Sequence, residues 1–207
     1  KDEEHFYSEK ILYLDDIWNC HSGFPYKREF NEAPISYKKY VTFGSFNNFR
    51  KINDDVINIW SSILKKVSNA KLVLKPSDTA SFSKISEKFD RNGVLGSIIF
   101  LSHKKSFEEH LNDYKKIDIA LDTFPYNGVT TSFEAIWMGV PVLTMKGNNF
   151  NSRGGESINK NLDLDELIAE NEDDYISKAR NLAEDKILLS KISNKIYSSC
   201  LSSPLFD

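Results

Sequence analysis

The 207-residue sequence predicts an α/β fold, in which a parallel sheet is flanked by helices and followed by a helical C-terminal tail. Three observations support this prediction. Between residues 41 and 145, short apolar runs alternate with segments of helical periodicity. The stretch 117–145 has the pattern of a buried strand, a glycine-containing loop, a helix and a second buried strand. Beyond residue 145 only helical patterns follow.

The first strand is expected over residues 41–46, where Gly44 permits close approach of a neighbouring backbone. Asn53 is the expected N-cap of the next helix, whose first turn carries Asp54 and Asp55 as the helix dipole favours. Apolar residues recur along this helix at helical spacing: Val56, Trp60, Ile63, Leu64 and Val67.

Two more strands are expected over residues 71–75 and 97–101. Between them, Phe82, Ile85 and Phe89 have the spacing of one helix face. The links are short, which predicts parallel strands joined by right-handed crossovers.

Ser106 and Glu109 have the spacing of a capping box and start a third helix. The stretch 117–145 then supplies a strand over 117–121, a helix whose C-cap is Gly139, and a strand over 140–145. The order of these elements is that of a Rossmann-like domain.

The two ends of the chain are less regular. Residues 1–40 are interpreted as a linker or packed arm, with one short strand or turn near 10–14. Residues 146–155 form an expected polar loop. Four helical segments are expected beyond it: 157–161, 165–171, 173–184 and 186–199.

The composition excludes several classes of function. A formal net charge of -3 gives no support for nucleic-acid binding, and no apolar run is as long as a membrane span. The charged residues at the start predict no signal peptide, and the missing initiator Met suggests a piece of a longer protein. Cys20 and Cys200 form no metal-type or redox-type pair, so a cytoplasmic location is expected.

Polar side chains follow the first predicted strand. Lys51 could contact a diphosphate, and Asn47 or Asn48 could donate hydrogen bonds to it. The alternative is an ordinary loop in which the Asn residues form turns and Lys51 is solvated. His110, in the first turn of its helix, could contact a base or a phosphate, although a lone His is more often a surface or packing residue.

The loop after the strand 117–121 is the strongest candidate. Asn127 and Gly128 break the chain before a helix whose first residues include Thr130 and Thr131. Unpaired N–H groups at a helix start suit a phosphate. Glu134 lies three residues after Thr131, so it is either a capping-box partner or a carboxylate that accepts from ribose hydroxyls.

Other chemistries are poorly supported. The sequence has no G-x-G-x-x-G, no P-loop and no nucleophile elbow. Its four histidines lack ligand spacing, and Asp163 and Asp165 are interpreted as a helix N-cap instead of a metal motif. No metal site and no cofactor are predicted.

Three sequence segments resemble the C-terminal catalytic lobe of the O-linked N-acetylglucosamine transferase family. They are FGSFNNFRKIND, EEHLNDYKKIDIALDTFPYNGVTTSFEAIWMGVPVLTM, and SR with a later SPLFD. FGSFNN, LDTFPY and EAIWMGVP are most similar to the SPINDLY-like and bacterial tetratricopeptide-linked members. The resemblance covers 41–207 and implies the nucleotide-sugar-binding lobe of a GT-B glycosyltransferase. Residues 1–40 resemble the end of the preceding lobe and the interlobe linker.

The resemblance also implies roles for single residues. Lys51 matches the lysine that contacts the donor diphosphate, and this contact would be its catalytic role. Asn48 matches a neighbouring position that contacts the donor. Phosphate binding falls to Thr130 and Thr131 in the N-G-x-T-T motif. The remaining matches are Glu134 at the ribose and His110 near the base. Two positions depart from the family: Val129 stands where many members have His, and Glu134 replaces a shorter Asp.

The activity implied is inverting, metal-independent transfer of a sugar to Ser or Thr of a protein, with UDP-GlcNAc as the expected donor. The alternatives are a GDP-fucose-dependent O-fucosyltransferase, another GT-B enzyme or nucleotide-sugar epimerase, and a non-catalytic module with the same fold. The acceptor protein is expected to bind through an N-terminal lobe and upstream tetratricopeptide repeats. The piece alone is therefore expected to transfer little or nothing.

Overall fold

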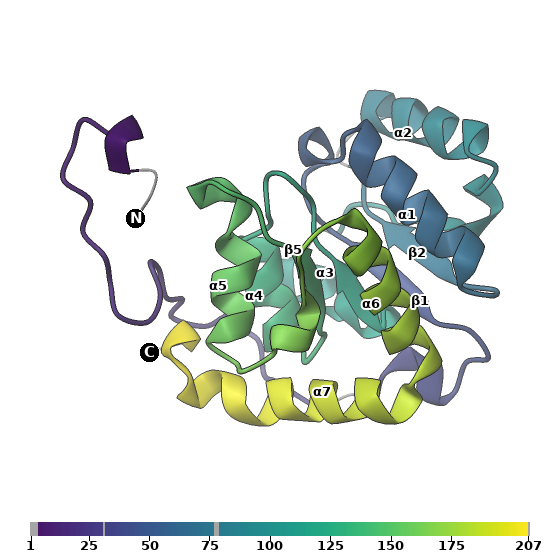
Figure 1. Ribbon diagram of the computed structural model, residues 1–207. Helices are drawn as coiled ribbons and strands as arrows, with labels where there is room; N and C mark the ends of the chain where they lie inside the picture. The colour runs from purple at the N-terminus through teal and green to yellow at the C-terminus, as the bar shows by residue number, and fades with distance from the viewer. Residues whose placement is uncertain (1–3, 31, 77–78, 207) are drawn as a thin grey trace.

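The computed structural model describes residues 4–30, 32–76 and 79–206. Within them, one six-stranded sheet of entirely parallel strands has the order β3-β2-β1-β4-β5-β6 (Figure 1). The strands are β1 Thr42–Ser45, β2 Lys71–Leu74, β3 Ile98–Phe100, β4 Ile119–Leu121, β5 Val142–Met145 and β6 Ile168–Ala169. The helices are α1 Asp54–Lys66, α2 Thr79–Arg91, α3 Phe107–Asn112, α4 Thr130–Trp137, α5 Gly154–Lys160, α6 Glu172–Glu184 and α7 Lys186–Ser199.

The strand order reverses between β1 and β4, which are direct neighbours in the sheet. Their register pairs Phe43 with Ile119 and Gly44 with Ala120. Gly44 is needed here because a Cβ at this position would lie 2.5 Å from Cγ2 of Ile117. In open α/β sheets, the crevice at such a reversal is where ligands bind. The carboxyl ends of β1 and β4 are therefore the expected ligand-binding edge of the sheet.

Helices cover both faces of the sheet. α1 packs beside α6 over one face, while α7 runs across one end of the domain and contacts α4 and α6 (Figure 1). α6 also packs on β5. The N-terminal segment, purple in Figure 1, extends away from the domain before it reaches the sheet.

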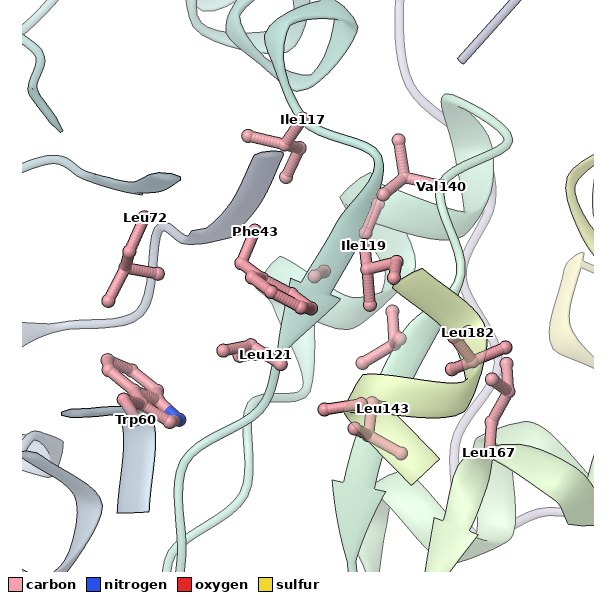
Figure 2. Packing of buried hydrophobic residues seen from close by; sticks show 14 of the residues in the cluster. Phe43, Trp60, Leu72, Ile117, Ile119, Leu121, Val140, Leu143, Leu167 and Leu182 are labelled. Atoms are coloured by element: carbon pink, nitrogen blue, oxygen red, sulfur yellow. The ribbon is translucent and has the colours of Figure 1, made fainter. Parts of the chain in front are cut away.

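Large apolar side chains from the strands and α1 fill the core (Figure 2). Phe43, Trp60, Leu72 and Ile119 are completely buried, and Leu121 of β4 is 2% exposed. Strands buried on both faces explain the almost continuous apolar runs in the sequence.

Most predicted elements are confirmed, including the N-caps of two helices; the C-cap of α4 is Met138, one residue before the expected Gly139. The Asn53 side chain accepts from the Val56 N–H, and Ser106 and Glu109 form the capping box of α3. Gly139, just beyond α4, has a positive φ of 76°. Such a left-handed residue commonly terminates a helix.

Three predictions at the ends are wrong. Residues 165–171 are not a helix, because one 3-10 turn, Asp165–Leu167, leads into β6, whose buried Ile168 pairs with Thr144 of β5. α5 starts at Gly154, inside the expected loop 146–155. Residues 10–14 have no regular secondary structure.

In the described part of the chain, no helix has the length and apolar character needed to cross a bilayer.

Candidate functional site

The carboxyl ends of β1 and β4 bring two of the predicted segments together. After β1, residues 46–48 lead into a 3-10 turn, Phe49–Lys51. After β4, residues 122–129 lead into α4. The Nζ of Lys51 donates to the carbonyl oxygen of Asn127 at 2.8 Å, and it lies 4.2 Å from the ring centroid of Tyr126. A cation is thereby fixed beside the start of α4.

Partial burial of Lys51 influences its charge. Desolvation lowers the pKa of the Lys51 ammonium, while the nearby carboxylate of Asp122 acts in the opposite direction. An amine in this position gains from an incoming anion, because its present acceptors are a carbonyl oxygen and an aromatic ring.

Asp122, at the end of β4, shapes the loop that follows. Its Oδ1 accepts from the N–H groups of Thr123 at 2.8 Å and Gly128 at 2.6 Å, and its Oδ2 accepts from the Thr144 hydroxyl at 2.8 Å. Burial raises the pKa of Asp122 to about 6, although these hydrogen bonds oppose the shift. Sequence reasoning assigned Asp122 no role, although a polar residue at a strand end was the available signal.

The Asn127 side chain forms hydrogen bonds that hold the loop after β4 in place. Its buried side chain donates from Nδ2 to the Thr123 carbonyl at 2.9 Å and accepts from the Gly155 N–H at 3.3 Å. Its own N–H donates to the Asn151 carbonyl at 2.9 Å. The structure therefore places the Asn127 side chain in support of the loop, and its carbonyl oxygen beside Lys51.

Close packing joins Gly128, Asn47 and Thr131. The Thr131 hydroxyl donates to Oδ1 of the buried Asn47 at 3.0 Å. A Cβ on Gly128 would lie 2.5 Å from the Thr131 Oγ1 and 2.7 Å from the Asn47 Oδ1. Only glycine fits between these two side chains, which tie the loop after β1 to α4.

The start of α4 has unpaired donors. Its N-cap is Val129, and no side chain caps it, so the capping-box alternative for Glu134 is wrong. Within the described residues, the N–H groups of Thr130 and Thr131 have no hydrogen-bond acceptor. Thr130 is exposed and Thr131 is half-buried. An anion placed here would find two N–H donors and the positive end of the helix dipole.

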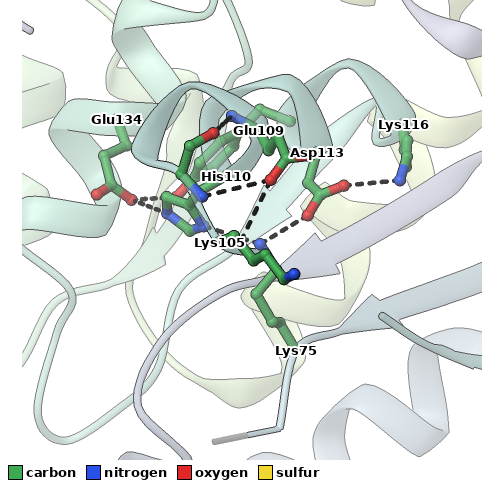
Figure 3. A network of polar contacts seen from close by, with 9 residues as sticks. Lys75, Lys105, Glu109, His110, Asp113, Lys116 and Glu134 are labelled. Atoms are coloured by element: carbon green, nitrogen blue, oxygen red, sulfur yellow. Dashed lines mark hydrogen bonds and ion pairs between the residues drawn. The ribbon is translucent and has the colours of Figure 1, made fainter. Parts of the chain in front are cut away.

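His110 lies in a buried polar network with Glu134 (Figure 3). Its Nε2 is 3.0 Å from Oε2 of Glu134, and its Nδ1 is 2.8 Å from Nζ of Lys75. The Tyr114 hydroxyl donates to the same Glu134 oxygen at 2.8 Å. Burial, with the Glu134 charge, raises the pKa of Tyr114 well above its ordinary value, so the hydroxyl keeps its proton and donates.

Asp113 links two lysines to this network. It forms ion pairs with Lys75 at 2.6 Å and with Lys116 at 2.6 Å. Burial acts to raise the pKa of Asp113, but the hydrogen bonds and charges of the two lysines outweigh it and lower the pKa. Sequence reasoning missed Lys75 and Tyr114, because both lie in patterns that otherwise indicate a strand end and an apolar helix face.

Asn48 has the alternative role that the sequence allowed. It is exposed, and its Oδ1 accepts from the Arg50 N–H at 3.0 Å, which caps the 3-10 turn that carries Lys51. The predicted helix cap at Asp163 and Asp165 is wrong. The 3-10 turn Asp165–Leu167 has Leu164 as its N-cap, and no side chain caps it. Among the described residues, no group of three or more His, Cys, Asp or Glu could hold a metal ion.

A cavity of about 10 Å³ lies at the candidate edge, lined by residues that include Asn47, Asp122 and Thr131. This cavity is too small to hold a nucleotide. A larger cleft of about 900 Å³ separates residues of the N-terminal segment, among them Tyr7 and Tyr13, from the loop 147–153. That cleft contains none of the residues predicted for the site.

The arrangement can hold a diphosphate and a neighbouring polyol. The Lys51 ammonium and the unpaired N–H groups of Thr130 and Thr131 lie at the same edge. The buried carboxylate of Glu134, which belongs to α4, is hydrogen-bonded to His110. These are the groups that recognise phosphate oxygens and ribose hydroxyls.

Several known proteins resemble this chain in sequence. Residues 35–207 match the family model of glycosyl transferase family 41. A protein of Petunia hybrida, named a probable UDP-N-acetylglucosamine–peptide N-acetylglucosaminyltransferase SPINDLY, is 35% identical over 208 residues. The match covers 96% of this chain and 22% of the plant protein. The corresponding SPINDLY protein of Arabidopsis thaliana is 34% identical over 95% of the chain.

Solved structures show the same architecture. A mutant of the Thermobaculum terrenum O-GlcNAc transferase superposes with a TM-score of 0.90 at 29% identity, covering 98% of this chain and 39% of that one. The C-terminal domain of a group 1 glycosyl transferase from Francisella tularensis superposes with a TM-score of 0.63. Its identity is 18%, and 84% of this chain and 93% of that domain are covered, so it supports the fold alone.

Proposed function

Because the chain belongs to glycosyl transferase family 41, we propose that it is the donor-binding lobe of an inverting, metal-independent glycosyltransferase that modifies Ser or Thr of a protein. The fold is that of a GT-B C-terminal lobe. The observation that carries the proposal is the 2.8 Å hydrogen bond from Lys51 to the Asn127 carbonyl, which sets a cation beside the uncapped start of α4.

The proposed chemistry uses this cation at the leaving group. An acceptor hydroxyl attacks the anomeric carbon of the donor sugar, and the bond from that carbon to the diphosphate oxygen breaks. Negative charge then develops on the diphosphate. Lys51 and the N–H groups of Thr130 and Thr131 would stabilise that charge, which is the task that a metal ion performs in other transferases.

The remaining site residues are assigned to the nucleoside. Glu134 would accept from ribose hydroxyls, and His110 would lie against the base. Asn47 and Asn48 would contribute through the loop that carries Lys51. The Asn127 side chain and the absence of a Cβ at Gly128 are expected to act by shaping the loop.

UDP-GlcNAc is the proposed donor, since the plant relatives are named as probable UDP-N-acetylglucosamine–peptide transferases. The chain spans about 22% of the length of these relatives. We therefore place the acceptor-binding site, the general base and any tetratricopeptide repeats in other parts of a longer protein. The chain alone is expected to bind the donor and to transfer little or no sugar.

Calorimetric titration of three variants with UDP-GlcNAc and with GDP-fucose tests the assignment. Lys51→Ala removes a charge-assisted hydrogen bond, worth about 1.5–3 kcal/mol, so the affinity should fall roughly 10- to 100-fold. Thr131→Ala keeps the backbone N–H but removes the hydroxyl that ties α4 to the loop carrying Lys51 through Asn47, and a roughly threefold to tenfold loss is expected. Arg50→Ala is the matched control, because this exposed cation lies next to Lys51 in the same turn.

Unchanged affinity in both Lys51→Ala and Thr131→Ala would contradict the proposed site. Tighter binding of the wild type to GDP-fucose than to UDP-GlcNAc would identify GDP-fucose as the donor, and the proposed binding site would stand. Binding of neither nucleotide would support the non-catalytic alternative.

A further inference from the structure

Lys75 is a buried lysine that the proposed function does not use. It directly follows β2, at the same edge of the sheet as the loops after β1 and β4, and its side chain is 4% exposed. A lysine is rarely buried unless its charge is paired. Here the Nζ pairs with Oδ2 of Asp113 at 2.6 Å and contacts Nδ1 of His110 at 2.8 Å (Figure 3).

The contact with Lys75 determines which nitrogen of His110 carries the proton. An ammonium group has three N–H donors and no acceptor, so the Nδ1 of His110 must accept from it. The ring proton is then on Nε2, which points at Oε2 of Glu134 at 3.0 Å and donates to it. The opposite tautomer would turn two donors toward each other at Nδ1 and leave Nε2 without a proton to donate to Glu134.

This orientation organises the Glu134 carboxylate. Its Oε2 accepts from both His110 and the Tyr114 hydroxyl, at 3.0 and 2.8 Å. All of its hydrogen bonds within the described residues use Oε2, so Oε1 has no partner there. Two donors on one oxygen fix the carboxylate plane and leave the second oxygen available to a hydroxyl of a ligand.

We propose that Lys75 is a positioning residue for nucleotide recognition. It holds His110 in the Nε2–H tautomer, and through it aims the free oxygen of Glu134 at the ribose. The proposal rests on the proposed function, because only a bound nucleoside gives that oxygen a ribose partner. Asp113 holds Lys75 in place through its ion pair.

Nuclear magnetic resonance of the histidine ring nitrogens tests the first step without any ligand. In the wild-type chain near pH 7.5, we expect His110 to show the neutral Nε2–H pattern. We expect the Lys75→Met variant to lose it, giving a mixture of tautomers, and the Lys75→Arg variant to retain it, because a guanidinium also donates to Nδ1.

Lys116→Met is the matched control. It removes the other cation that contacts Asp113, but Lys116 does not touch His110, and its side chain is 48% exposed. The tautomer of His110 should be unchanged in this variant. A loss of the Nε2–H pattern in Lys116→Met as large as in Lys75→Met would overturn the specific role of Lys75.

Titration with UDP tests the second step. The affinity of Lys75→Met should be roughly tenfold weaker than that of the wild type, as expected for the loss of an oriented hydrogen bond. Lys75→Arg and Lys116→Met should remain within about twofold of the wild type. Equal affinity of wild type and Lys75→Met would overturn the positioning role even if the tautomer changes.

The two proposals fail in different ways. If the wild type binds neither UDP nor GDP, the proposed function fails, and the inference fails with it. If the wild type binds a nucleotide but its His110 carries the proton on Nδ1, or on both nitrogens, the inference alone fails. Should Lys75→Met not fold, the wild-type tautomer and the Lys75→Arg titration still decide.

Discussion

Replacing Asp122 by Asn should remove a pH dependence from the stability of the chain. Asn has nearly the same shape, and its Oδ1 can still accept the hydrogen bonds from the N–H groups of Thr123 and Gly128. The Thr144 hydroxyl, which now donates to Oδ2, can rotate to accept from the new amide. The fold should therefore survive the substitution, unlike Asp122→Ala, which would strand three donors.

The magnitude follows from the pKa of Asp122. Burial raises it from 3.8 to about 6, so the folded state holds a proton that the unfolded state has released between these values. The free energy of unfolding therefore falls as pH rises from about 4 to about 6. The full span is about 3 kcal/mol, and about 2 kcal/mol of it lies between pH 4.5 and pH 7.5. Asp122→Asn has no such proton.

Urea unfolding followed by tryptophan fluorescence at the two pH values measures the effect. The stability of Asp122→Asn relative to wild type should be about 2 kcal/mol more favourable at pH 7.5 than at pH 4.5. The difference cancels every other titrating group. Asp90→Asn, the same chemical change at an exposed position, serves as the control. A relative stability of Asp122→Asn that does not change with pH would refute the reasoning.

Two further substitutions test the packing of the site and the core. Gly128→Ala should weaken UDP binding at least roughly tenfold, since its Cβ would lie 2.5 Å from the Thr131 hydroxyl, whereas Gly96→Ala, with no atom within 4 Å, should bind normally. Equal affinities would contradict the close packing. Leu121→Ala should lower the free energy of unfolding by about 2–5 kcal/mol in urea titrations, and Leu201→Ala, at a half-exposed position, by much less. Similar losses would show that β4 is not central to the core.

The sequence predicted the parts of the fold that repeat a strong pattern. Five strands carry short apolar runs at regular intervals, and the caps at Asn53 and Ser106 use side chains with a specific hydrogen-bonding role. β6 was missed because its two residues are too short for a period to show. Its pairing with β5 depends on the position of the sheet edge, which is a tertiary property.

The candidate site was predicted as separate segments, and the structure supplies the contacts between them. Lys51 and Asn127 are 76 positions apart in sequence, and only the order of β1 and β4 brings them together. Asp122 and Lys75 were missed because a single polar residue after an apolar run ends a strand in most proteins. Their roles depend on partners that no local pattern reveals.

The central claim is that a nucleoside diphosphate binds across the loops after β1 and β4. Its most direct test is to map the backbone amide shifts of the wild-type chain during a titration with UDP. We expect the largest changes at Thr130 and Thr131, with smaller ones near Lys51. Changes confined to the loop 147–153, beside the larger cleft, would contradict it.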